Sequence, residues 1–86
     1  MDFHLVTPTY NKKFSVSWIE LNSSAGNFVI QLGHRPMFLV LEPGKELIYC
    51  LKTGKKETVI VEDGVAHIMR DSAKIIVSPQ KKSSKK

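Results

Sequence analysis

The stretch "GHRPMFLVLEPG", residues 33–44, decides the fold. Gly33 and Pro36 predict a corner, five apolar residues follow it at Met37–Leu41, and Pro43-Gly44 ends the apolar run. Proline presets the backbone φ of a turn, and glycine permits the positive φ that a type II turn needs next. The stretch therefore predicts a strand between two turns, apolar enough to be buried on both sides or to cross a corner of a sandwich.

The rest of the chain repeats this pattern of short strands and turns. Segments rich in Val, Ile, Phe and Thr alternate with turn residues about every eight to twelve residues. No segment sustains a helical period. We expect an all-β fold, a small antiparallel β-sandwich of about eight to ten short strands without a substantial helix. The predicted strands cover residues 3–7, 14–21, 28–31, 37–41, 46–51, 57–62, 65–70 and 74–77.

Two irregularities are predicted within this pattern. The apolar residues of the strand over residues 14–21 change face between Val16 and Ile19, which indicates a β-bulge or burial on both faces. The dipeptide Asp63-Gly64 is the strongest short hairpin signal in the chain, so we predict a tight turn centred on Gly64.

Length and charge limit the classes of protein. The 86 residues suffice for one small domain, predicted at residues 1–78, and residues 79–86 read as a disordered Lys/Ser-rich tail. The net charge is +5, but four lysines lie in the last six residues, and nine basic against eight acidic residues remain without them. Neither a signal peptide nor a membrane helix is predicted, and the single cysteine, Cys50, fits a cytosolic protein.

The residues that could act in catalysis or bind a metal are not arranged in the sequence as an active site or a metal site would require. His34 and Arg35 adjoin, but no nucleophile or carboxylate partner accompanies them, so a structural or interface turn is favoured. The three histidines lack the spacing of metal ligands, and no glycine-rich phosphate loop is present. We expect no catalytic residue, metal or cofactor, and a binding role. Two alternatives stay open at this point: a small basic β-barrel that binds nucleic acid, and a small ligand-binding β-sandwich.

Several ordered motifs resemble one family, the N-terminal β-sandwich domain of the epsilon subunit of F-type ATP synthases. The family opens near "F-H-L-x-I-V-T-P", and its centre runs "G-E-F-G-V-L-P-G-H-A-P-L", followed by an apolar strand and "K-P-G". The matching segments here are Phe3–Pro8, Gly26–Met37 and Glu42–Gly44, with looser matches at Phe14–Leu21 and Glu62–Ile68. The resemblance covers nearly the whole chain, from Asp2 to Val77.

The resemblance implies a non-catalytic rotor subunit that joins the gamma stalk to the membrane c-ring. It implies a peripheral location at the cytoplasmic face of a bacterial inner membrane, with no nucleic acid and no small-molecule substrate. Partner contacts are expected at Asn27, Phe28, His34, Arg35 and Met37. The family's acidic residue before Phe28 is Asn27 here, so the electrostatic part of ring docking is either lost or supplied by another residue. The family usually adds a C-terminal helical hairpin, which this sequence does not show.

Overall fold

The computed structural model describes residues 1–79, which form strands joined by turns and contain no helix. The tail predicted at residues 79–86 lies, beyond Pro79, outside the described residues. No helix within residues 1–79 is long and apolar enough to cross a membrane. The strands are β1 (Asp2–Val6), β2 (Asn11–Ser23), β3 (Gly26–Ile30), β4 (Met37–Val40), β5 (Lys45–Leu51), β6 (Lys56–Ile68) and β7 (Ser72–Pro79).

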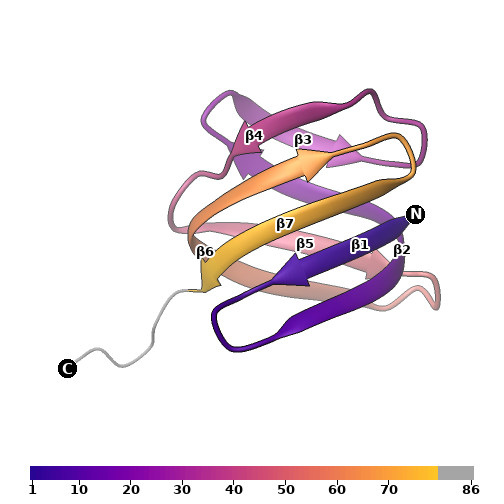
Figure 1. Cartoon of the computed structure of the whole chain (residues 1–86), viewed down its shortest axis with the longest axis horizontal. Helices are drawn as coiled ribbons and strands as arrows, with labels where there is room; N and C mark the ends of the chain where they lie inside the picture. The colour runs from indigo at the N-terminus through magenta and orange to yellow at the C-terminus, as the bar shows by residue number, and fades with distance from the viewer. Residues whose placement is uncertain (80–86) are drawn as a thin grey trace.

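The seven strands form one hydrogen-bonded sheet that folds into two layers (Figure 1). A five-strand layer contains β4, the second half of β6, β7, β1 and the first part of β2. A four-strand layer contains β3, the second part of β2, β5 and the first half of β6. The predicted all-β sandwich is confirmed, and β2 and β6 each serve both layers. One pairing, between β1 and β7, is parallel.

Each of the two long strands, β2 and β6, contains a β-bulge where it passes from one layer to the other. In β2 the register shifts between Val16 and Trp18, so that Val16 and Ile19 are both buried, as the sequence predicted. In β6 the register shifts between Val61 and Asp63. Each bulge thus reverses the alternation of side chains at the point where the strand changes layer.

The hairpin predicted at Asp63-Gly64 is wrong, because β6 runs through both residues as one strand. Gly64 does not have a positive φ. A Cβ atom there would lie 2.9 Å from the carbonyl oxygen of Ile76 and 3.0 Å from Cδ1 of Leu41. The glycine is needed because the neighbouring strand approaches closely, rather than for a turn.

The chain turns at both ends of the segment that contains β4. Gly44 has φ +80°, and the Lys45 N–H donates to the Glu42 carbonyl at 3.4 Å. Gly33 has φ +87°, and its N–H donates to the Arg70 carbonyl at 2.6 Å, which holds the corner before Pro36 against the β6–β7 turn.

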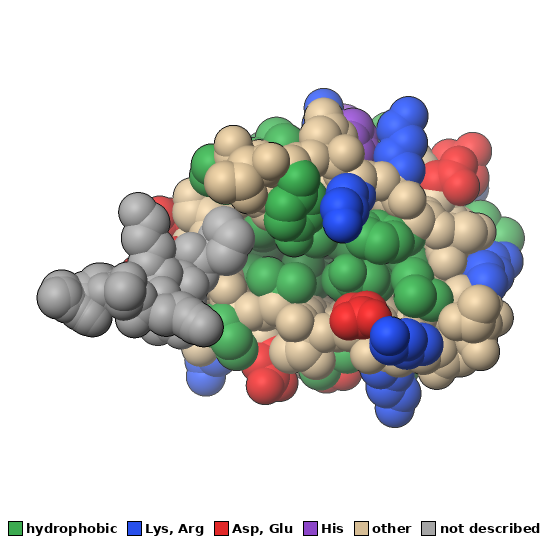
Figure 2. All heavy atoms as spheres, turned by 90° about the horizontal axis from the view of Figure 1, so that it is seen from below, with side chains coloured by type: hydrophobic (Ala, Val, Ile, Leu, Met, Phe, Trp, Pro, Cys, Tyr) green, Lys and Arg blue, Asp and Glu red, His purple; other side chains and the backbone are tan. Residues whose placement is uncertain are grey.

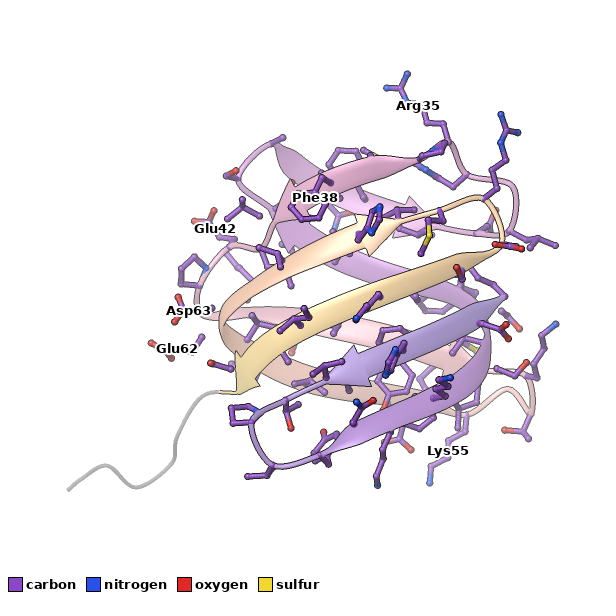
Figure 3. All side chains as sticks on the ribbon, viewed as in Figure 1. Arg35, Phe38, Glu42, Lys55, Glu62 and Asp63 are labelled. Carbon is purple, nitrogen blue, oxygen red and sulfur yellow. The ribbon has the colours of Figure 1, made fainter. Side chains whose placement is uncertain are left out.

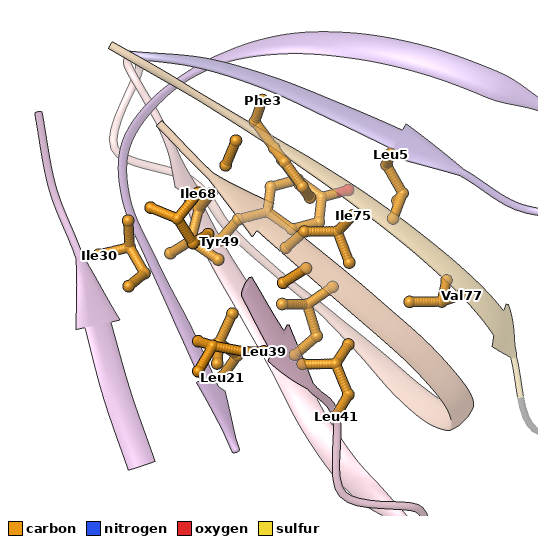
Figure 4. Close-up of a cluster of buried hydrophobic side chains, with 14 of the residues drawn as sticks. Phe3, Leu5, Leu21, Ile30, Leu39, Leu41, Tyr49, Ile68, Ile75 and Val77 are labelled. Atoms are coloured by element: carbon orange, nitrogen blue, oxygen red, sulfur yellow. The ribbon is translucent and has the colours of Figure 1, made fainter. Parts of the chain in front are cut away.

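The core lies between the two layers (Figure 4). It is built from inward side chains of every strand, among them Phe3, Leu21, Ile30, Leu39 and Ile75. Figure 2 looks onto the edge where the first part of β2 faces the first half of β6, and apolar side chains reach the surface there. The rings of Phe14 and Tyr49 lie 5.0 Å apart between the layers. Inward positions are thus mostly apolar, and the outward positions of the two layers differ more from one another.

Candidate partner-binding face

The outer face of the five-strand layer carries a continuous apolar row across four strands. Val40 pairs with Val65, Val65 with Ile76, and Ile76 with Val6. Val40 is 58% exposed and Ile76 is 46% exposed, although both belong to residue types that are usually buried. We call Val40, Val65, Ile76 and Val6 the apolar row.

A second row runs parallel to the first, two residues farther along each strand. His67 pairs with Lys74, Lys74 with His4, and His4 with Lys13. We call these four residues the basic row. Among residues 1–79 the only ion pair joins Lys55 to Glu57, so neither Lys13 nor Lys74 has a carboxylate within 4.0 Å. The basic row therefore presents two lysines without internal partners.

Phe38 lies beside the basic row on β4 and is the most exposed large apolar side chain in residues 1–79, at 68%. Its ring packs edge-on against His67, with 5.5 Å between the ring centroids. Figure 3 shows Phe38 on the strand at the rim of the five-strand layer. An exposed aromatic ring beside a row of basic residues is typical of an interface anchor.

Carboxylates gather on the other side of the apolar row. Glu42, Glu62 and Asp63 lie at the same end of the molecule in Figure 3, and we call them the acidic end. Glu42 and Asp63 also line a groove of about 730 Å³ whose wall includes Val40, Val65 and Ile76. The outer face of the five-strand layer thus has three bands, acidic, apolar and basic, and we call it the banded face.

The residues predicted to contact partners lie along one rim of the sandwich, on β3, β4 and the loop between them. Phe28 and Met37 are half-buried and pack against the core. His34 and Arg35 occupy the loop, where the His34 N–H donates to the Gln31 carbonyl at 3.1 Å. Arg35 is exposed and extends away from the sandwich (Figure 3). These residues form a strip on the rim, whereas the broader banded face adjoins it on the five-strand layer.

Asn27 lies at the start of β3, against two residues of β2. Its Nδ2 donates to Oε2 of Glu20 at 3.1 Å and to Oδ1 of Asn22 at 3.1 Å. The Glu20 carboxylate therefore lies directly beside the position where the resembled family has its acidic residue. A negative charge is present at this site although residue 27 is neutral.

Sequence reasoning missed the apolar row and Phe38. The prediction that Met37–Leu41 is buried on both sides is wrong, since Phe38 and Val40 face outward while Leu39 and Leu41 are buried. Two-residue alternation marks which of these residues share a face, but it cannot say which of two apolar faces is covered. The pairing of distant strands was needed to bring Val40, Val65 and Ile76 into one row.

A further cavity lies beside the basic row. Its volume is about 430 Å³, and it lies over β1, β2 and β7. Its lining includes His4, Lys13 and Lys74, together with Asp2 and two serines, Ser15 and Ser72. Within residues 1–79, no three or more His, Cys, Asp or Glu side chains come together in a way that could hold a metal ion.

Comparison with known proteins identifies relatives of the whole described fold. The profile of the family described as ATP synthase, Delta/Epsilon chain, beta-sandwich domain matches residues 1–80. No curated protein matches the sequence. The family match gives no support to the nucleic-acid and small-ligand alternatives.

Two solved structures have the same fold at low sequence identity. A chain of the Euglena gracilis mitochondrial ATP synthase is 23% identical, with a TM-score of 0.79 over 87% of this chain and 48% of its own length. A chain of the Tetrahymena thermophila mitochondrial ATP synthase, central stalk and c-ring, is 21% identical, with a TM-score of 0.76 over 91% of this chain and 63% of its own. This chain thus spans about half of the first and less than two thirds of the second.

Proposed function

Because the chain belongs to the family of ATP synthase delta/epsilon-chain β-sandwich domains, we propose that it is a non-catalytic rotor subunit. In this role it joins the central gamma stalk to the membrane c-ring of an F-type ATP synthase. The chain transmits torque through contacts and needs no bound cofactor. The bacterial membrane expected from the sequence stays a prediction, because the two similar structures are mitochondrial.

The banded face is the observation that carries this proposal. Phe38, Val40 and Ile76 are exposed in one contiguous region, although the core has ample inward positions for apolar residues. A soluble domain seldom keeps such a region uncovered unless a partner covers it. We assign the whole of this face, its acidic end included, to the stalk, together with His34 and Arg35 on the adjoining rim.

The end of the sandwich near Asn27 is our candidate for the contact with the c-ring. The Glu20 carboxylate beside Asn27 supplies the negative charge that the resemblance places there. Electrostatic complementarity with a basic ring loop would speed association and fix orientation more than it would raise affinity.

The test is binding to a purified subcomplex of gamma stalk and c-ring that lacks its epsilon-type subunit. We expect the 86-residue chain to co-sediment with the subcomplex and to restore coupled proton pumping when the catalytic head is added. A single-stranded oligonucleotide of twenty bases or so serves as the rival ligand. Failure to bind the subcomplex, with tight and salt-dependent binding to the oligonucleotide, would refute the rotor role.

A further inference from the structure

We propose that the banded face accepts an amphipathic helix lying across the strands, with acidic side chains on one flank and basic side chains on the other. The inference rests on the proposed function, since the helix would belong to the stalk-side partner. It goes further by stating the secondary structure, direction and charge pattern of the bound segment. Three features of the face carry it: the spacing of the apolar row, its distance from the basic row, and the sign of the charges on each side.

The spacing of the apolar row matches the repeat of a helix. Neighbouring strands lie about 4.8 Å apart, so the four strands from β4 to β1 place one apolar side chain about every 4.8 Å. An apolar helix stripe has one residue per turn of about 5.4 Å. A helix of about ten residues therefore covers Val40, Val65, Ile76 and Val6 with one side chain over each strand.

The basic row lies where the flank of such a helix would lie. Two residues along a strand span about 6.7 Å, which separates the basic row from the apolar row. The radius of a helix with its side chains is about 5 to 6 Å. Glutamates on that flank would thus stand above Lys74, a central residue of the basic row. Its neighbour His4 is already hydrogen-bonded to the side chain of Asn11, so Lys74 is the main partner expected there.

The opposite flank meets charges of the other sign. Asp63 and Glu42 line the groove beside Val40 and Ile76, so basic or neutral side chains suit the helix there. Because Lys74 and Lys13 lack carboxylate partners within residues 1–79, no internal ion pair must break when a partner binds. Complementary charges on both sides of an apolar stripe fix the register and orientation of a bound segment.

The two-sided charge pattern also sets the direction of the helix. Turning a helix end for end on the sheet exchanges its two flanks, so only one direction places glutamates over the basic row. A helix with the same sign on both flanks would meet repulsion from either Lys74 or Asp63 in both directions. The face therefore selects for mixed flanks, and a simply acidic or simply basic segment fits less well.

A designed peptide tests the inference directly. The probe is an eighteen-residue helix, on the order of five turns, with a leucine stripe, glutamates on one flank and lysines on the other. We expect it to bind the 86-residue chain in low salt, and we expect Lys74→Glu to weaken binding about five- to ten-fold, the scale of one lost surface pair plus repulsion. Lys52→Glu, the same charge change on an exposed residue of the β5–β6 hairpin, should change it less than about two-fold.

Rescue and rival ligands complete the test. A peptide with neutral glutamines over Lys74 should bind Lys74→Glu and the unaltered chain equally. Equal affinity of mixed-flank, all-glutamine and all-lysine peptides for the unaltered chain would overturn the inference. Tighter, Lys74-dependent binding to vesicles of phosphatidylglycerol would also overturn it, in favour of a membrane surface.

The outcome is separable from that of the proposed function. If the chain binds the rotor subcomplex but ignores the charge pattern of the peptides, the rotor role stands and the helix inference fails. If the peptides bind as expected but the rotor subcomplex does not, the rotor role fails and the binding specificity of the banded face stands.

Discussion

The two layers of the sandwich bury the same kind of side chain inside but differ in what they show outside. On the five-strand layer, Val40, Val65 and Ile76 share one row and the basic side chains share another. On the four-strand layer a single row reads Val29, Glu20, Ile48 and Thr58, with apolar and polar residues interleaved. Strand alternation explains both cores equally. The sorted outer face indicates an extended partner, whereas on the interleaved face only the corner at Glu20 and Asn27 is assigned to a contact.

The stability of the fold should be most sensitive to a substitution in β6, one of the two strands that serve both layers. We expect Gly64→Ala to lower the free energy of unfolding by about 3 kcal/mol, since the added Cβ meets the backbone carbonyl of Ile76 at 2.9 Å. At Gly54 an added Cβ meets no atom within 4 Å, and only the positive φ of +98° is unfavourable for alanine. Gly54→Ala should therefore lower the free energy of unfolding by about 1 kcal/mol. Urea denaturation measures both. An equal cost at the two glycines would mean that β6 does not pass so close to β7.

The next largest effect should separate the two outer faces. Phe38→Asp on the five-strand layer should weaken binding to the stalk and c-ring subcomplex about 30-fold, as for loss of an aromatic anchor. Thr58→Asp, on an exposed outward residue of the four-strand layer at the edge opposite β3, should leave binding unchanged. Both proteins should fold, because neither side chain is buried. Equal losses from the two substitutions would remove the distinction between the faces.

The two ends of the β4 segment give a smaller contrast, now in stability. Gly44 has φ +80°, so Gly44→Val should cost more than about 1 kcal/mol. His34→Ala, on the partly exposed loop before β4, should cost less than about 0.5 kcal/mol. Within residues 1–79, the one hydrogen bond of the His34 ring joins Nδ1 to the carbonyl of its neighbour Arg35, at 3.0 Å. Urea midpoints in the opposite order would contradict the turn at Gly44.

The smallest predicted effect concerns Tyr49, between the layers. Burial raises the pKa of its hydroxyl above the ordinary value of 10.0, and the charges of Glu57 and Tyr10 raise that pKa further. The folded protein holds this proton more tightly than the unfolded chain does. Its contribution to stability is therefore complete below pH 10 and is lost as the pH rises through the pKa of the folded state. Between pH 8 and 11, the free energy of unfolding should decline less for Tyr49→Phe than for the unaltered protein. Tyr10→Phe, at an exposed residue, should show most of the decline of the unaltered protein.

Local signals predicted the parts of the fold that depend on neighbouring residues. The turn at Pro43-Gly44 and the bulge between Val16 and Ile19 follow from glycine conformation and from side-chain alternation. Asp63-Gly64 carried an equally strong local signal but was misread. Gly64 is required by its close contact with β7, which is distant in sequence, and a local pattern contains no information on that contact.

The banded face could not be predicted for the same reason. The basic row needs β1 to lie parallel to β7, so that His4 stands beside Lys74. No short-range pattern specifies that pairing. The apolar composition of residues 37–41 predicts that Phe38 and Val40 are buried, but both are exposed. Composition alone does not distinguish a side chain that packs in the core from one that a partner covers.

Site-specific photocross-linking tests the central claim most directly. A benzoylphenylalanine replaces either Ile76, in the outer face of the five-strand layer, or Ile48, in the outer face of the four-strand layer. Each protein is bound to the subcomplex of gamma stalk and c-ring and irradiated, and the cross-linked products are identified by mass spectrometry. The account predicts adducts with the stalk from position 76 and no adducts with the stalk from position 48. Stalk adducts from position 48 alone, or equally from both positions, would show that the banded face is not the surface that binds the stalk.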